Sequence, residues 1–284
     1  MKIPAYYGFW HHLGAWFLKT SSWLVLLFLI MPILVIIPLS FNVEPFFSFT
    51  EGMLTLQPEA YSLRWYSAIF SDDKWLLAIK NSFLIGIFAT LLATLLGTCA
   101  AVGLARDDMP YRRLITALLL SPMIVPLIIT AAGMFFFYSD LGLAGNYLGV
   151  IIAHAALGTP FVIITVTATL TGFDYSLARA ALNLGATPLR VFFDIIMPLI
   201  RPGVISGALF AFITSFDEVV VILFMAGPQQ RTSPRQMFSG LREQINPSIL
   251  AIATLLILVS IALLVTLELL RRRSERLRGA ERIE

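Results

Sequence analysis

Two adjacent acidic residues stand out because of where they fall in the chain. Asp217 and Glu218 lie inside a stretch from Pro202 to Gln230 that is otherwise uncharged and largely apolar. A helix that starts near Pro202 rises about 1.5 Å per residue, so it carries the pair roughly 23 Å along its axis. If this helix spans a membrane, an acidic side chain at that depth costs at least about 2–3 kcal/mol. We therefore expect the pair to face the interior of a helix bundle or water.

Small residues mark one face of this helix, and Glu218 lies on that face. Spacings of three and four residues between small side chains indicate close approach of another helix. The pattern predicts that Glu218 faces a neighbouring helix or a solute path, whereas Asp217 is turned by about 100° from it. The face consists of Gly203, Gly207, Ala211, Thr214 and Glu218.

Two interpretations of the acidic pair remain open. In the first, Asp217, Glu218 and the nearby Thr214 line or gate a solute path, where the carboxylates attract a cation such as a polyamine. In the second, the carboxylates pair with Arg or Lys of a neighbouring subunit and hold an interface together. We favour the first, because ionisable residues inside a membrane mark functional sites by default. His154, in another apolar stretch, is interpreted as a hydrogen-bonded packing residue.

The sequence lacks the residue sets of common catalytic and metal sites. Asp140 lies at a predicted helix end, G-x-S-x-G does not occur, and Cys99 with scattered histidines has no zinc-ligand spacing. A Walker A loop needs a Gly-Lys pair, and none of the four lysines follows a glycine. We therefore expect no catalytic residue, no metal site and no cofactor bound by this chain. Its energy must come from a partner or an ion gradient.

The elements that position these residues are long apolar helices. The chain is 58% hydrophobic and 13% charged, against about 25% charged in a soluble domain. Five uncharged stretches of 24, 25, 26, 33 and 24 residues each exceed the roughly 20 residues needed to cross a bilayer. With the stretch that carries the acidic pair, they predict an all-α membrane protein with about six transmembrane helices. The predicted spans lie near 23–41, 81–105, 114–138, 148–170, 202–225 and 248–270.

Basic residues predict the orientation of these helices. With six spans, fourteen Lys and Arg residues lie on the side of both termini and six lie on the other side, and the more basic side faces the cytoplasm. We expect a cytoplasmic segment at 1–22, a transmembrane domain at 23–270 and a basic cytoplasmic tail at 271–284. Six basic residues lie in that tail, which is typical of a membrane anchor and does not indicate nucleic-acid binding.

The cytoplasmic loop 171–203 has the pattern of two short helices. Ser176 is expected to cap a first helix from Leu177 to Leu184, and Gly185 to end it. The two helices would form an elbow, which is apolar enough to dock against a partner or to lie on lipid headgroups.

The second helix of this elbow is expected to start at Thr187, its cap, with Pro188 in the first position. Pro198 and the pair Pro202-Gly203 are expected to end it before the chain returns to the membrane.

The elbow resembles the EAA loop of ABC importer permeases. The family pattern reads E-A-A, three residues, G-A, five residues, F, and a terminal L-P…P-G, and its spacing matches this chain throughout. Arg179 stands where the family usually has Glu, so the polar contact that this Glu makes to the partner in the family does not carry over to this chain as an expectation, and Met197 stands where Leu is usual. The residues that match in position are Arg179, Ala180, Ala181, Gly185, Ala186, Phe192, Pro198, Pro202 and Gly203.

Two further segments resemble the same family, so the resemblance covers most of the chain. Asn81-Ser82-Phe83 is similar to the usual Asn-Ser at the start of the family's second span. The run Ser-Phe-Asp-Glu-Val-Val at 215–220, followed by Ala-Gly-Pro at 226–228, is similar to the spermidine/putrescine permease subgroup. The resemblance implies a type I ABC importer permease-like bundle whose elbow is a coupling helix, seated in a cleft of an ATPase.

The resemblance also implies an assembly in the bacterial inner membrane. Its partners would be a second permease subunit, two ATP-binding cassette ATPase subunits that use ATP and Mg, and an extracytoplasmic solute-binding protein. The second permease could be a paralogue or a copy of this chain, and the resemblance to polyamine systems favours the paralogue. The implied activity is ATP-driven import of putrescine or spermidine by alternating access. Two alternatives stay open. One is a permease for another small amine-bearing solute, and the other is an ion-coupled secondary transporter that uses Asp217 and Glu218 and acts without partners.

Overall fold

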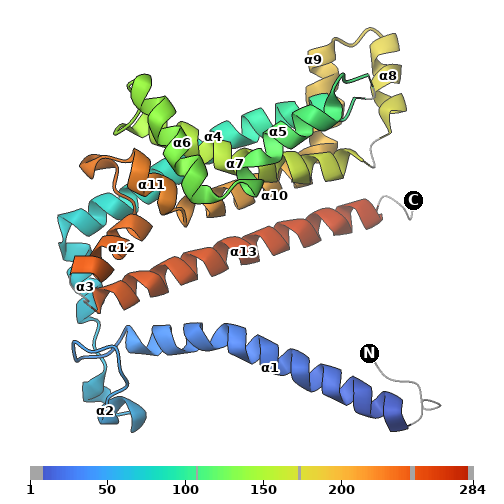
Figure 1. Ribbon diagram of the computed structural model, residues 1–284. Coiled ribbons are helices and arrows are strands. Elements are labelled where there is room, and N and C mark those ends of the chain that lie inside the picture. The colour runs from blue at the N-terminus through green and yellow to red at the C-terminus, as the bar shows by residue number, and fades with distance from the viewer. Residues whose placement is uncertain (1–8, 107, 172–173, 244–246, 281–284) are drawn as a thin grey trace. The chain divides into compact units, whose positions relative to one another are not determined.

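Helices make up the regular structure of this chain, which the computed structural model describes over residues 9–106, 108–171, 174–243 and 247–280 (Figure 1). They belong to two compact units. One comprises Met1–Ile69 with Ile245–Leu255, and the other comprises Phe70–Gln244 with Leu256–Glu284. The last helix, α13 Ser248–Ala280, contributes residues to both units.

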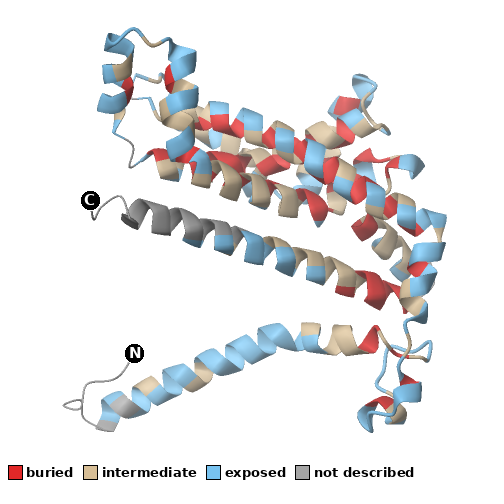
Figure 2. Cartoon of the chain, turned by 180° about the vertical axis from the view of Figure 1, so that it is seen from behind, coloured by how far each residue is buried: buried red, intermediate tan, exposed pale blue. Residues whose placement is uncertain are grey.

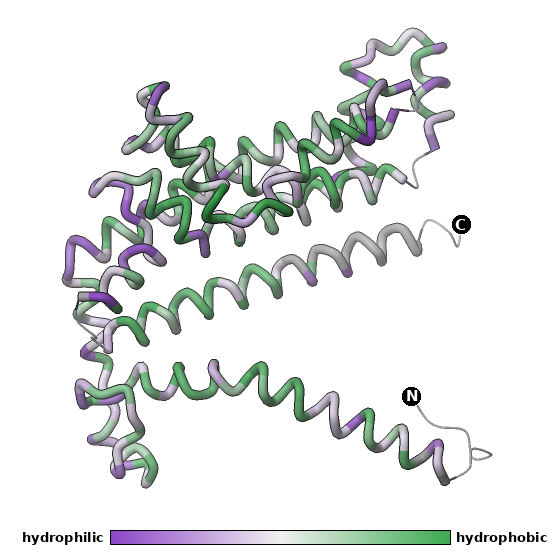
Figure 3. The backbone as a smooth tube through the Cα atoms, in the orientation of Figure 1, coloured by the Kyte–Doolittle hydropathy of each residue, from purple (hydrophilic) through white to green (hydrophobic). Residues whose placement is uncertain are grey.

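The first unit is dominated by one long apolar helix, α1 Phe9–Leu39. Its stretch Leu13–Leu39 is long and apolar enough to cross a membrane, yet only 6% of its most apolar window is buried. Figure 2 shows this helix as mostly exposed, and Figure 3 shows that much of its length consists of hydrophobic residues. Lipid or another subunit is therefore needed to cover α1.

Asn42 organises the loop that follows α1. Its Nδ2 donates to the carbonyl oxygens of Phe46 at 3.3 Å and Ser48 at 3.0 Å, and its Oδ1 accepts the Glu44 N–H at 2.9 Å. Trp65 Nε1 donates to the Asn42 carbonyl at 2.8 Å. This loop therefore has a defined conformation. Its short helices are α2 Glu51–Leu54, η1 Pro58–Ala60 and α3 Arg64–Ser71.

Three long helices form the core of the second unit: α4 Asp73–Leu104, α7 Tyr147–Leu170 and α10 Met197–Phe216. Glycines let α7 approach both neighbours closely. A Cβ on Gly97 of α4 would lie 2.6 Å from Val162 Cβ, and one on Gly207 of α10 would lie 2.8 Å from Val162 Cα. Small residues thus hold α7 between α4 and α10, as their predicted spacing on α10 indicated.

The predicted span 114–138 is bent rather than straight. It corresponds to α5 Arg112–Ile124 and α6 Leu127–Asp140, whose axes differ by 105°. Pro126 explains the break, because a residue that precedes proline is pushed out of the helical region. Val125 accordingly has ψ of 136°.

The predicted end of the second elbow helix at Pro198 and Pro202 is wrong. α9 Pro188–Val191, the π-helical turn η2 Phe192–Ile196 and α10 follow one another without a gap, and one apolar helical stretch runs from Pro188 to Phe216. The wider π turn lies directly before Pro198, at the place where proline would disrupt α-helical hydrogen bonds.

Beyond Phe216 this long helix is interrupted, and shorter elements follow. The interruption covers residues 217–219, which lie inside the predicted span 202–225. The elements beyond it are α11 Val220–Met225, η3 Pro228–Gln230 and α12 Ser233–Glu243.

The prediction of an all-α membrane protein is confirmed. Over the described residues, five helices are long and apolar enough to span a membrane, or six if α5 and α6 together form one span. The helices α1 and α13 extend into the predicted terminal segments 1–22 and 271–284. Residues 1–8 and 281–284 of those segments lie outside the described part, so the predicted division into domains stays a prediction.

Candidate functional site

The elbow begins with α8 Tyr175–Asn183, and Asp174 caps it. The Asp174 carboxylate accepts the Ser176 N–H at 2.9 Å, so the predicted cap at Ser176 is wrong by two residues. An anionic acceptor suits the positive end of a helix. Hydrogen bonding from the Ser176 side chain, and then from its backbone N–H, lowers the pKa of Asp174.

Gly185 ends α8 in a Schellman motif. The N–H of Ala186 donates to the Ala181 carbonyl at 3.0 Å, and the Gly185 N–H donates to the Leu182 carbonyl at 3.0 Å. Gly185 has φ of +88°, a left-handed conformation that glycine adopts without strain. The predicted role of Gly185 as the end of the helix is confirmed.

The second half of the elbow starts as predicted. The Thr187 hydroxyl accepts the Arg190 N–H at 3.4 Å, and Pro188 occupies the first turn of α9. The elbow lies at one end of the second unit, while α11 and α12 lie at the other end (Figure 1). Several large apolar side chains of the elbow are exposed in this chain: Leu177, Leu182, Leu184, Leu189 and Phe193.

The predicted coupling residues lie on this elbow and on the start of α10. Their role in coupling stays a prediction. Arg179, Ala180 and Pro198 are exposed, Ala181, Ala186, Phe192 and Pro202 are half-buried, and Gly203 is buried against Thr165 and Thr169 of α7.

Glu218 caps the helix that restarts after the interruption. Its Oε1 accepts the Val220 N–H at 2.9 Å, and its Oε2 accepts the N–H groups of Val221 at 2.8 Å and Ile222 at 3.2 Å. The carboxylate thus satisfies backbone donors that an interrupted helix leaves unpaired in an apolar environment. Glu218 is 6% exposed.

His154 of α7 lies beside this cap. Its Nδ1 shares a hydrogen bond of 2.8 Å with Ser215 Oγ, and its Nε2 lies 3.9 Å from Glu218 Oε2. The interpretation of His154 as a hydrogen-bonded packing residue is confirmed. Its proximity to Glu218 escaped sequence reasoning, since 64 residues separate the two positions and no local pattern connects them.

Asp217 lies in a different environment from its neighbour. It is exposed, and within the described residues its carboxylate has no hydrogen bond or ion pair. Thr214, one turn earlier on α10, is half-buried. The structure therefore brings Glu218 to the α11 backbone and leaves Asp217 accessible in this chain. The role of all three residues in a solute path stays a prediction.

Asn81 and Ser82 join α4 to the segment that follows α11. Asn81 Nδ2 donates to the carbonyl oxygens of Gln229 at 2.8 Å and Arg231 at 2.9 Å, and Ser82 Oγ accepts the Ser233 N–H at 2.9 Å. Tyr147 Oη on α7 donates to Asn81 Oδ1 at 3.0 Å. The sequence singled out Asn81 and Ser82 only through the family resemblance, without these partners.

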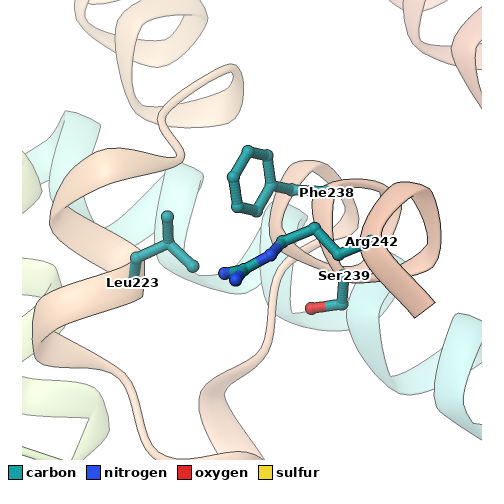
Figure 4. A pocket seen from close by; sticks show the side chains of 4 residues that line it. All are labelled: Leu223, Phe238, Ser239 and Arg242. Carbon is teal, nitrogen blue, oxygen red and sulfur yellow. The ribbon is translucent and has the colours of Figure 1, made fainter.

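A cavity of about 350 Å³ lies between α11 and α12, lined by Leu223, Phe238, Ser239 and Arg242 (Figure 4). None of the predicted site residues lines it. Over the part of the chain that the structure describes, no group of three or more His, Cys, Asp or Glu residues is arranged to hold a metal ion.

Comparison with known proteins places this arrangement among transport proteins. The chain is 30% identical over 263 residues to the spermidine/putrescine transport system permease protein PotC of Haemophilus influenzae, covering 92% of this chain and 99% of the relative. It is 34% identical over 241 residues to the putrescine transport system permease protein PotI of Escherichia coli, covering 81% and 82%.

Solved structures show the same fold at lower sequence identity. A chain of a bacterial ABC transporter involved in the import of alginate matches with a TM-score of 0.72 at 16% identity, covering 93% of this chain and 99% of that one. A chain of an amino acid ABC transporter matches with a TM-score of 0.55 at 14% identity, covering 80% and 100%.

The family match rests on the segment that holds α7, the elbow and the interrupted helix. Residues 93–277 match the model of the family described as "binding-protein-dependent transport system inner membrane component". With two relatives at 30% and 34% identity over most of its length, the chain belongs to this family of inner membrane transport components.

Proposed function

We propose that this chain is the permease subunit of an ATP-driven importer that moves a polyamine, such as putrescine or spermidine, into the cytoplasm by alternating access. The observation that carries the proposal is the exposed Asp217 carboxylate at the interruption of a membrane helix, in a chain whose relatives are named as polyamine permeases. A carboxylate without a protein partner attracts an ammonium group, and a polyamine carries at least two such groups.

Asp217 and Glu218 have different tasks in this proposal. The Glu218 oxygens are engaged by three backbone N–H groups, so Glu218 gates the path indirectly, by shaping the interruption. Asp217 is the residue that meets the cation, with Thr214 one turn away.

The elbow supports an ATPase partner. Its apolar side chains include Leu184, which is 89% exposed, and Leu189, which is 72% exposed. Exposed apolar patches mark sites where another protein or a membrane binds. We assign this surface to a cleft of an ATP-binding cassette subunit, two of which use ATP and Mg while the permease itself is not an enzyme. The coupling contacts are assigned to Arg179, Ala180, Ala181, Gly185, Ala186, Phe192, Pro198, Pro202 and Gly203.

The remaining partners follow from the same proposal. A second permease subunit, a paralogue, completes the membrane part, and an extracytoplasmic solute-binding protein delivers the polyamine. The protein lies in the bacterial inner membrane with both termini in the cytoplasm, as the distribution of basic residues predicts.

Uptake of radiolabelled putrescine by vesicles that contain the whole complex tests the proposal. We expect Asp217→Asn to lower the uptake rate by about tenfold at unchanged permease abundance. The matched control is Asp140→Asn, which removes an exposed carboxylate at the end of α6. Uptake that survives without any ATPase would favour the secondary transporter, and normal uptake by Asp217→Asn would exclude Asp217 from the path. Competition by unlabelled amines identifies the preferred solute.

A further inference from the structure

The buried imidazole of His154 has no part in the function proposed so far. His154 is 1% exposed and lies in the first half of α7. One ring nitrogen, Nδ1, is bonded to Ser215 at the end of α10. The other, Nε2, has no hydrogen-bond partner among the described residues, and it faces the Glu218 carboxylate across 3.9 Å. One side chain of α7 thus lies against Ser215, which precedes the interruption, and against Glu218, which lies within it.

The distance between Nε2 and Glu218 Oε2 leaves room for movement. A direct N–H···O hydrogen bond is about 2.7–3.2 Å long, so a displacement of about 1 Å would close this gap. A buried polar atom without a partner costs free energy, so each such atom in a native protein calls for an explanation, which can be strain, a functional role or a bound water. Such a movement would bring Nε2 within hydrogen-bonding distance of the Glu218 carboxylate.

The two sides of this contact differ in how firmly they are held. On one side, α7 packs closely against α4 and α10 through glycines. A Cβ on Gly158, one turn after His154, would lie 2.9 Å from Ala211 Cβ. On the other side, the helical hydrogen bonds stop at the Asp217 N–H, which donates to the Ile213 carbonyl, and resume at the Val219 carbonyl, which accepts the Leu223 N–H. His154 is therefore a fixed reference against which the interruption is oriented.

We propose that His154 is a positioning residue for transport: through Ser215 and Glu218 it holds the interruption between α10 and α11 in the geometry that presents Asp217. This inference rests on the proposed function, because the presented carboxylate is the one assigned to the cation. His154 acts through its neighbours and does not touch the solute.

Three substitutions of His154 separate its polar contacts from its volume. Asn places an amide near the position of Nδ1, Gln places one near the position of Nε2, and Leu fills the space without polar atoms. In complexes of equal abundance, we expect His154→Leu to lower the maximal putrescine uptake rate about tenfold. The solute concentration at half-maximal rate should stay unchanged, because the binding protein captures the solute. Asn or Gln at position 154 should restore at least half of the maximal uptake rate that Leu loses.

The inference is overturned if His154→Leu transports like the wild type, or if neither Asn nor Gln exceeds Leu. If His154→Leu does not assemble, the comparison of Asn and Gln with the wild type replaces it. Normal uptake by both would then support the inference, and loss of uptake in both would overturn it.

A second measurement does not depend on the solute. In a Cys99→Ser, Asp217→Cys chain, the rate of reaction with a cationic methanethiosulfonate reagent reports the accessibility of position 217. The chain with Cys99→Ser alone is the blank. We expect His154→Leu to lower this rate at least threefold and Asn or Gln to restore it. An unchanged rate contradicts the positioning role even if polyamine uptake is confirmed. If the wild-type complex takes up no polyamine, the proposed function fails, but the labelling still tests the geometry.

Discussion

At the scale of single residues, the acidic pair shows how a membrane helix accommodates charge. Glu218 turns its carboxylate onto three N–H groups of α11, so the protein supplies the compensating partial charge from its own backbone. Asp217 keeps its carboxylate exposed. Neither of the two predicted sources of positive charge, a cationic solute or a neighbouring subunit, is therefore needed to explain Glu218, whereas Asp217 is left available to either of them.

Replacement of Glu218 by Ala should destabilise the protein much more than replacement of Asp217 by Ala. Glu218→Ala leaves buried backbone N–H groups without an acceptor, and each such group costs about 1–3 kcal/mol. Asp217→Ala removes an exposed side chain without a partner, and its effect should stay within about 0.5 kcal/mol. Thermal unfolding of the detergent-solubilised protein measures the difference. Equal unfolding temperatures for the two variants would show that Glu218 does not stabilise α11.

At the scale of elements, the local signals in the sequence differ in how well they locate boundaries. Gly185 and Pro188 mark the ends of the elbow helices because they act on their own backbone, and both predictions are confirmed. Pro198 and Pro202 do not end a helix: the π turn η2 precedes Pro198, and Pro202 lies inside α10. The interruption at 217–219 contains no glycine or proline that would have predicted it from the sequence. It depends on the ability of Glu218 to cap a new helix.

Replacement of Gly185 by Ala should loosen the elbow without affecting the membrane helices. An L-residue in the left-handed region costs about 1–2 kcal/mol, and no atom lies within 4 Å of the added Cβ, so the cost is conformational rather than steric. We expect the amide hydrogen of Ala186 to exchange faster and putrescine uptake to fall. Asn183→Ala is the matched control, since it alters an exposed neighbour outside the proposed coupling surface but leaves the Schellman bonds in place. Equal exchange rates in Gly185→Ala and the wild type would contradict this role.

At the scale of the whole molecule, most of the long helices expose apolar surface that this chain does not cover. In α1, 6% of the most apolar window is buried, compared with 61% in α7; the values are 22% for the stretch from Pro188 to Phe216, 28% for α13 and 33% for α4. The chain itself therefore covers α7 best, while α1 above all depends on lipid or on other subunits. This agrees with membership in a family of transport-system components.

The proposed orientation leads to a test on the intact chain. Fourteen basic residues lie on the side of both termini and six on the other, so we expect a C-terminal fusion of green fluorescent protein to fluoresce and one of alkaline phosphatase to be inactive. A phosphatase fused within the loop at 42–72 should be active. An active phosphatase at the C-terminus would reverse the orientation and place the elbow on the wrong side for an ATPase.

The sequence by itself determined the membrane class, the approximate spans and the elbow, because hydrophobic length, glycine and proline act locally. It also singled out Asp217 and Glu218, because charge in an apolar stretch is visible without a structure.

Only the tertiary structure decided what each carboxylate contacts. His154 lies close to Glu218, 64 positions away, and Asn81 donates a hydrogen bond to Gln229, 148 positions away. Such contacts depend on how α4, α7 and α10 pack through their small residues. The interruption of the fifth span likewise follows from a side chain that satisfies the backbone donors of a restarted helix.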